Sequence, residues 1–221
     1  MGLIGREIRG VLFGSQDVYA DAGPSDNGYP HTHLSESLVE RVLRERQPQY
    51  WVEVGSMLGG SALLVARVAE RLGLELDVVC VDPFTGDVNM WAWEQGLVRE
   101  GKWRFLGLVN GAPTIRQRFL ANVKDAGFED VITPLPATGI VGMRVLERVS
   151  GYRPDVVYVD SAHEQDETFL ELTTAWELLV KGGLLMGDDL DWPAVRHDVY
   201  RFAESLGVQV EVVGNQWLIG K

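Results

Sequence analysis

The amino-acid sequence predicts an α/β fold: a mostly parallel sheet with helices on both faces that ends in an antiparallel hairpin. From about residue 35 onward, short runs of Val, Leu and Ile alternate with segments whose apolar residues recur every three or four positions. Strands that are almost wholly apolar and are joined through helices are typical of a parallel sheet buried on both faces. The last run, "VQVEVVGNQWLIG", contains two strand-like segments around Gly214 and Asn215, which is a hairpin signal.

Each element has its own local signal. Ser35 is a candidate N-cap for the first helix, whose apolar residues share one face before "QPQ" ends it. The segment "YWVEVG" is predicted to be the first buried strand, and residues 21–33, rich in Gly, Pro, Asp and Asn, are predicted to form a long loop. The same reasoning predicts helices over 61–72, 114–126, 139–149, 165–181 and 193–206, and strands over 77–82, 131–135, 155–160 and 183–187.

Length and composition favour a single domain over residues 1–221, because a chain that is 46% hydrophobic at this length can bury one sizeable core. The formal net charge of −12 opposes a phosphate backbone, so no nucleic-acid partner is expected. The only cysteine, Cys80, lies in an apolar run, which excludes an internal disulfide and favours a reducing, cytoplasmic location. No apolar stretch approaches the ~18 residues of a membrane span, so no membrane association is expected.

A glycine-rich turn joins the first strand to the next helix. "VEVGSMLGGSA", residues 52–62, carries Gly55, Gly59 and Gly60. Glycine permits positive φ and a close approach of a ligand, and the N–H groups of a helix start suit a polar or anionic group. Met57 stands where a dinucleotide fingerprint has its second glycine, and the chain has no P-loop. The alternative is that the glycines only make a tight turn.

Two acids accompany this turn. Asp82 ends the second strand 27 residues after Gly55, where a carboxylate can accept both hydroxyl protons of a ribose. Glu53 lies within an otherwise apolar strand, where a carboxylate is costly unless a cation or a donor meets it. The turn and the two acids together indicate a nucleoside ligand.

On "VEVGSMLGGSA" and "VCVDPF" the chain resembles the class I S-adenosylmethionine-dependent methyltransferases, with the element order matching over roughly residues 35–220. The resemblance implies the Rossmann-like seven-stranded methyltransferase sheet and S-adenosylmethionine as cofactor. It implies that Asp82 holds the ribose and that "LPATG" is the adenine-contacting turn. The residues that it assigns to the methionine part and its turn are Glu53, Gly55, Ser56, Gly59 and Ser61, and those that it assigns to the adenine are Ala137 and Thr138.

Three carboxylates follow two neighbouring strands. Asp160 ends the strand 155–160, and Asp188 and Asp189 end the strand 183–187. The carboxyl ends of neighbouring parallel strands lie side by side, so these acids should converge at the crevice where such sheets bind ligands. Like charges this close repel unless a cation lies between them or one stays protonated. A hard divalent ion, Mg²⁺ or another such as Ca²⁺ or Mn²⁺, is expected to bind between them. The alternative is solvated strand-end acids that cap the next helices.

The spacing of these acids, 28 and 29 residues after Asp160, is similar to that of the metal-dependent O-methyltransferases of the catechol type and of the macrocin type, which modifies sugars on macrolide antibiotics. The macrocin type carries Asp-Asp at the later position, as here. The catechol type places a lysine base three residues after the first aspartate, where this chain has His163. A histidine is a workable proton acceptor at neutral pH, so His163 and Asp160 are the catalytic candidates. The alternative for His163 is a helix-start residue hydrogen-bonded to neighbouring acids.

Two segments are expected to lie over the crevice. Residues 86–112 interrupt the alternation, and a long insertion of this kind near a crevice is usually functional. It carries Trp91 and Trp93 as candidate acceptor contacts, with a place in the core as the alternative. The N-terminal arm, residues 1–34, is expected to close the other side, with Tyr29, His31 and His33 as further candidates.

The sequence therefore predicts a divalent-metal-dependent O-methyltransferase that acts on a hydroxyl of a small molecule, such as a sugar in natural product biosynthesis or a catechol-like diol. Two alternatives stay open: a cephalosporin hydroxylase-like enzyme of the same fold, and a nucleoside-binding module without turnover. A homo-oligomer is expected only from the resemblance.

Overall fold

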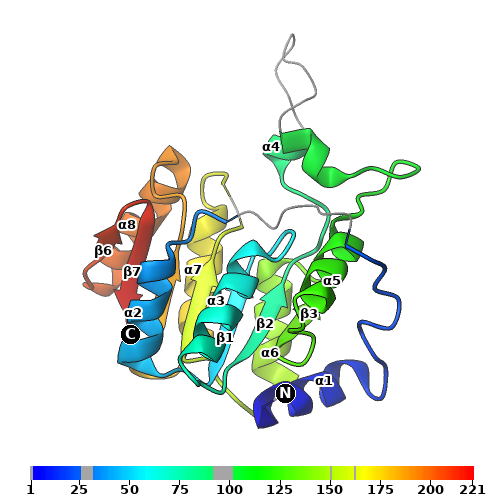
Figure 1. Ribbon diagram of the computed structural model, residues 1–221. Helices are drawn as coiled ribbons and strands as arrows, with labels where there is room; N and C mark the ends of the chain where they lie inside the picture. Colours follow the sequence, from blue (N-terminus) through cyan, green and yellow to red (C-terminus); the bar gives the residue numbers. More distant parts are fainter. Residues whose placement is uncertain (1, 26–31, 92–101, 150, 162) are drawn as a thin grey trace.

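The computed structural model describes residues 2–25, 32–91, 102–149, 151–161 and 163–221. Within these ranges the chain builds a seven-stranded sheet of order β3-β2-β1-β4-β5-β7-β6 (Figure 1). The first five strands are parallel, and β7 and β6 add an antiparallel pair at one edge. The predicted fold class is confirmed. The strands are β1 (Tyr50–Val54), β2 (Asp77–Val81), β3 (Ile132–Leu135), β4 (Val156–Val159), β5 (Leu184–Gly187), β6 (Glu211–Val213) and β7 (Gln216–Gly220).

Helices cover both faces of this sheet and create two hydrophobic cores. Side chains alternate across a strand, so in β1 Trp51 packs into one core and Val52 into the other. The described part of the chain contains no helix with both the length and the apolar composition that crossing a bilayer requires. The helices are α1 (Leu3–Phe13), α2 (Glu36–Arg46), α3 (Gly60–Arg71), α4 (Val88–Trp91), α5 (Ile115–Asp125), α6 (Gly139–Val149), α7 (Glu167–Leu178) and α8 (Pro193–Leu206), with a 3-10 turn, η1 (Lys102–Leu106).

Most predicted elements are present, and their bounds either match the prediction or differ from it by up to three residues. Ser35 precedes α2 as expected, but its hydroxyl meets Ser37 Oγ at 2.8 Å and does not cap the helix backbone. The hairpin turns at Gly214, whose φ of 63° is the left-handed conformation that glycine tolerates. Cys80 is buried and free, as predicted.

The first helix, α1, was not predicted, and it lies at the opposite end of the sheet from the crevice (Figure 1). Its N-terminal backbone amides bond to the carboxylate of Asp77, at the start of β2: Gly2 N at 3.1 Å and Gly5 N at 2.8 Å. The expectation that the whole arm 1–34 lies over the site is therefore wrong for α1. Thr32 and His33, at the end of the arm, do reach the cavity described below.

Candidate functional site

The carboxyl ends of β1, β2, β4 and β5 open into a cavity of about 1100 Å³. The glycine turn after β1 forms one wall, and the hairpin tip at Gly214–Gln216 forms another. The insertion contributes Gly86, Asp87, Asn89, Met90, Arg104 and Phe105 to the lining. Ligand pockets usually measure about 300–1000 Å³, so this cavity has room for more than one small molecule.

The glycines in the turn allow close packing of the backbone as well as the approach of a ligand. Gly55 has a φ of 86°, and a Cβ built there would lie 2.0 Å from the carbonyl oxygen of Asp160. A side chain at this position would therefore push β1 and β4 apart. Gly59, with a φ of 88°, directly precedes α3. Both glycines have the positive φ predicted for the turn, and part of the role of Gly55 is to let the ends of β1 and β4 lie close together.

Asp82 holds the glycine turn in place. Its Oδ2 accepts hydrogen bonds from Ser56 N at 2.8 Å and Met57 N at 2.7 Å, and its Oδ1 accepts one from Phe84 N. Burial raises the pKa of Asp82, while these backbone bonds act in the opposite direction. The carboxylate also lines the cavity. Its predicted contact with a ribose stays a prediction.

Glu53 is fully buried beneath the turn, and within the described residues neither of its carboxylate oxygens has a hydrogen-bond partner. Burial raises its pKa to about 8, so the group is mostly protonated at neutral pH. Ser56 and Ser61 lie close enough to lower the pKa, but neither makes a hydrogen bond of normal geometry to it. Both serines also line the cavity, whereas Glu53 is not part of its lining.

Thr138 lies on the cavity wall, while Ala137 packs partly against the core. Two further polar residues on this wall were missed by sequence reasoning, Ser161 and Glu171. The Ser161 hydroxyl donates a hydrogen bond to Glu171 Oε2, and burial raises the pKa of Glu171 to about 7. Glu171 lies inside an ordinary helical pattern, so nothing in the sequence distinguishes it.

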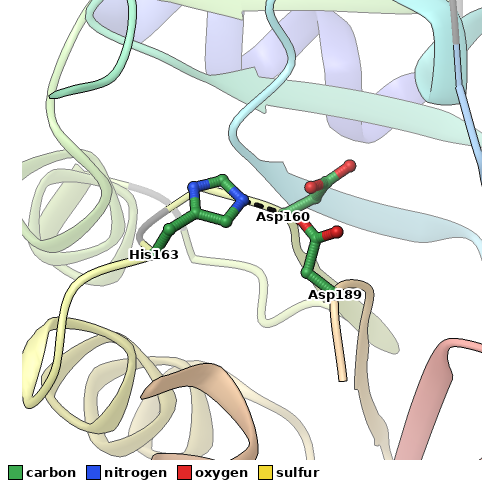
Figure 2. Close-up of side chains that lie close together, drawn as sticks. All are labelled: Asp160, His163 and Asp189. Atoms are coloured by element: carbon green, nitrogen blue, oxygen red, sulfur yellow. Dashed lines mark hydrogen bonds and ion pairs between the residues drawn. The ribbon is translucent and has the colours of Figure 1, made fainter. Parts of the chain in front are cut away.

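Asp160, His163 and Asp189 form a cluster with the composition of a metal site (Figure 2). Each offers one ligand atom, and these atoms lie within 4.8 Å of one another. Asp160 keeps some surface open, yet the surrounding protein raises its pKa to about 7, first by burial and then through the charges of Asp188 and Asp189. The predicted convergence of acids is therefore present at the ends of β4 and β5.

Asp188 differs from its neighbour Asp189. The Asp188 side chain is buried, and its Oδ1 accepts hydrogen bonds from Gln216 Nε2 at 3.0 Å and from Asp189 N at 2.8 Å. Asp189 has a φ of 60°, a left-handed conformation that is unusual for a residue other than glycine, and its carboxylate reaches the cluster. Asp188 lies beside the cluster and outside it, so its role as a metal ligand stays a prediction.

His163 lies between two carboxylates. Its Nδ1 is 2.7 Å from Asp87 Oδ2, and its Nε2 is 2.7 Å from Asp189 Oδ2. A carboxylate only accepts hydrogen bonds, so each ring nitrogen carries a proton in this arrangement. Burial lowers the pKa of His163, but the two carboxylates outweigh it and raise the pKa to about 10. The imidazolium therefore supplies positive charge to the acidic cluster, which matches the alternative interpretation of this histidine.

The remaining candidates have mixed outcomes. His33 lines the cavity. Trp91 is 43% exposed, is absent from the cavity lining, and donates its indole N–H to the Thr85 carbonyl oxygen at 2.8 Å. Trp192, which was not predicted, lines the cavity and lies 4.8 Å from the His163 ring, centroid to centroid. Tyr29, His31 and Trp93 lie outside the described residues.

Comparisons with known proteins bear on the whole fold. A family model described as a methyltransferase domain matches residues 52–190. No curated protein matches the sequence. The fold is similar to that of the O-methyltransferase TomG from Streptomyces achromogenes, involved in tomaymycin synthesis and solved with SAM, at a TM-score of 0.59 and 18% identity over 100% of this chain and 98% of that chain.

Two further solved structures are similar. An O-methyltransferase from Bacillus cereus, solved with SAH, has a TM-score of 0.58 and 13% identity, with 99% of this chain and 97% of that chain covered. The O-methyltransferase NovP has a TM-score of 0.57 and 15% identity, with 84% and 77% covered. At these identities the likeness concerns the fold.

Proposed function

The chain belongs to the methyltransferase domain family, and we propose that it transfers a methyl group from S-adenosylmethionine to a hydroxyl oxygen of a small molecule, with a divalent cation bound at the acidic cluster. The observation that carries this proposal is the meeting of Asp160, His163 and Asp189 in the same cavity as the glycine turn. The three structures named above, all described as O-methyltransferases, support transfer to oxygen.

The cofactor would lie against the turn after β1, between Ser56, Ser61, Asp82 and Thr138, all of which line the cavity. Glu53, which is buried near these serines and has no hydrogen-bond partner among the described residues, supports this placement, because a nearby cation or donor would stabilise a carboxylate there. When bound, S-adenosylmethionine supplies an electrophilic methyl group on a positively charged sulfur. TomG, solved with SAM, and the Bacillus cereus enzyme, solved with SAH, support this choice of cofactor.

Asp160 and Asp189 would hold the divalent cation, with Asp188 beside them. Their fit is supported by the pKa of Asp160, which burial and then the charges of Asp188 and Asp189 raise to about 7, since crowded carboxylates favour a cation. Oxygen ligands favour Mg²⁺, Ca²⁺ or Mn²⁺. A cation of this kind, when bound, would lower the pKa of a hydroxyl group that it contacts.

His163 would hold or accept the proton of the acceptor hydroxyl at Nε2. In the described arrangement this nitrogen is occupied by Asp189 Oδ2. That oxygen cannot serve a cation and the His163 proton equally well, so Asp189 would bond less strongly to Nε2 if it also held a cation, and His163 would release the Nε2 proton more easily. In the overall transfer His163 would first release its Nε2 proton to solvent; the acceptor oxygen would then gain the methyl group that the sulfonium gives up, and Nε2 would take the hydroxyl proton.

The acceptor would occupy the part of the cavity next to Met90, Phe105 and Trp192. These apolar side chains share the wall with Asp191 and Asn215, a mixture that suits a hydroxylated ring such as a sugar of a natural product or a catechol-like diol. The described role of TomG in tomaymycin synthesis supports a natural-product acceptor.

The test combines cofactor binding with metal removal. We expect S-adenosylhomocysteine to bind in a calorimetric titration and NAD not to bind. Methyl-labelled S-adenosylmethionine should then label hydroxylated sugars or diols in a panel, only when Mg²⁺, Mn²⁺ or Ca²⁺ is added to EDTA-treated protein. Full labelling by EDTA-treated protein would contradict the metal role, and no binding of S-adenosylhomocysteine would contradict the cofactor.

A further inference from the structure

Among the described residues, the carboxylates of Asp87 and Asp189 hydrogen-bond to His163, and Asp87 does not come from a strand end. It follows Gly86 at the start of the insertion 86–112 and precedes α4, and it is 76 residues from His163 in the sequence. Its Oδ2 lies 2.7 Å from Nδ1 of His163. The side chains are 19% and 14% exposed, so the pair is largely shielded from solvent. We propose that Asp87 is the positioning residue that fixes the orientation and the proton-bearing nitrogen of His163.

The two carboxylates on His163 have different surroundings. Asp189, on Nε2, belongs to the cluster with Asp160, whereas Asp87, on Nδ1, does not. Asp87 is therefore the carboxylate that would keep its hydrogen bond to the ring if Asp189 bound a cation together with Asp160. A carboxylate on Nδ1 requires a proton there, so the lone pair of a neutral ring is on Nε2, the nitrogen that faces Asp189.

Asp87 is itself held in place by its local backbone. Its Oδ1 accepts a hydrogen bond from Val88 N, its Oδ2 accepts one from Asn89 Nδ2, and its carbonyl accepts one from Met90 N at 2.9 Å. The preceding Gly86 has a φ of 78°, and a Cβ there would lie 2.4 Å from Leu106 Cδ2. The path of the chain into the insertion thus determines where this carboxylate lies. The insertion supplies a part of the site as well as a wall of the cavity.

This inference rests on the proposed function, because it assigns Asp87 to the residue proposed to take the proton. Asp87→Asn is the informative variant: the amide has the size of the carboxylate, but its NH₂ group can donate to Nδ1 and leave the proton-accepting lone pair on the wrong nitrogen. We expect kcat to fall about 100-fold or more, in the range of general acid–base contributions. The KM for S-adenosylmethionine, the Kd for S-adenosylhomocysteine and the melting temperature should stay close to those of the parent. Asp125→Asn, an exposed aspartate on α5, is the matched control.

A second measurement needs no turnover. An imidazole N–H bonded to a carboxylate gives a downfield proton resonance, which His163→Ala identifies by its loss. We expect Asp87→Asn to move or remove the Nδ1–H signal and Asp125→Asn to leave it unchanged. If Asp87→Asn keeps parental kcat and spectrum while His163→Ala is inactive, the inference is overturned and the proposed function stands. If His163→Ala itself keeps full activity, the proposed role of His163 as base is wrong, and the role of Asp87 falls with it.

Discussion

At the amino end of the sheet, the carboxylates of Asp77 and Asp155 accept hydrogen bonds from backbone N–H groups. Asp77 receives two from the start of α1, and Asp155 Oδ2 receives Gln49 N at 2.9 Å and Tyr50 N at 3.0 Å. At the carboxyl end, Asp160 lies near the carboxylates of Asp188 and Asp189, and His163, whose charge acts on Asp160, is shared by Asp87 and Asp189. Asp77 and Asp155 thus meet backbone donors, whereas Asp160 meets like charges; Asp82 and Asp188, also at the carboxyl end, accept backbone N–H groups as the first two do.

The difference separates acids that stabilise the fold from acids that store unfavourable electrostatic energy. A carboxylate that accepts backbone N–H groups contributes to folding, because those groups would otherwise be left without partners. Carboxylates that face one another repel, and a chain retains such an arrangement where a ligand relieves it. Changing Asp77 should therefore affect stability, and changing Asp160 should affect activity.

The largest effect is expected for Asp160→Asn. The amide keeps the shape of the side chain but removes the charge, so methyl transfer should fall at least about 1000-fold, which is about 4 kcal/mol in activation free energy. The melting temperature should stay the same or rise, because repulsion among the acids is reduced. Asp155→Asn, at the other end of the sheet, is the control and should keep its turnover. Equal loss of activity in the two variants would contradict the comparison.

The second effect concerns Asp77→Ala. Removal of this carboxylate leaves the first backbone amides of α1 without an acceptor, and we expect the free energy of unfolding in urea to decrease by about 2 kcal/mol. Asp77→Asn keeps one acceptor oxygen and should lose less. The affinity for S-adenosylhomocysteine should not change in either variant, because α1 lies at the far end of the sheet. Weaker binding would indicate that the two ends are coupled.

The same contrast explains which parts of the fold the sequence could predict. The strands were predictable because their apolar runs report burial directly, and the hairpin was predictable from Gly214 and Asn215. The helix α1 was missed because Gly5 and Gly10 disfavour a helix locally, and the carboxylate that holds its start lies more than 70 residues away. The repeat of Ile4, Ile8 and Leu12 at every fourth position was the signal that could have indicated it.

In the candidate site, Asp160, His163 and Asp189 were predictable together because parallel strand ends must meet at one edge of a sheet. The difference between Asp188 and Asp189 was not, because it depends on the positive φ of Asp189 and on Gln216 from β7. Asp87 was not predictable either, since its position follows from the path of the insertion. Local pattern therefore indicates which strands carry acids, and the tertiary structure decides where each carboxylate points.

The smallest effect, and the finest test of the comparison, is the pH dependence contributed by Glu53. This buried acid has no hydrogen-bond donor among the residues that the structure describes, and its pKa in the folded protein is about 8, compared with an ordinary value of 4.5. Between these two values the folded protein binds more protons than the unfolded chain. The contribution of Glu53 to stability is therefore complete below about pH 4.5 and is lost as the pH rises toward about 8, by roughly 1 kcal/mol per pH unit.

Glu53→Gln removes this titration. The free energy of unfolding of this variant should therefore fall less steeply than that of the parent between about pH 5 and about pH 8. Urea unfolding at each pH measures the slope, which matters here more than the absolute stability, because the buried amide has unpaired groups of its own. Glu45→Gln, an exposed glutamate near the end of α2, is the control and should follow the parent. Parallel curves for Glu53→Gln and the parent would mean that Glu53 meets a donor in solution. In that case this acid would resemble Asp77 and Asp155, and the division between the two ends of the sheet would be limited to the cluster around Asp160.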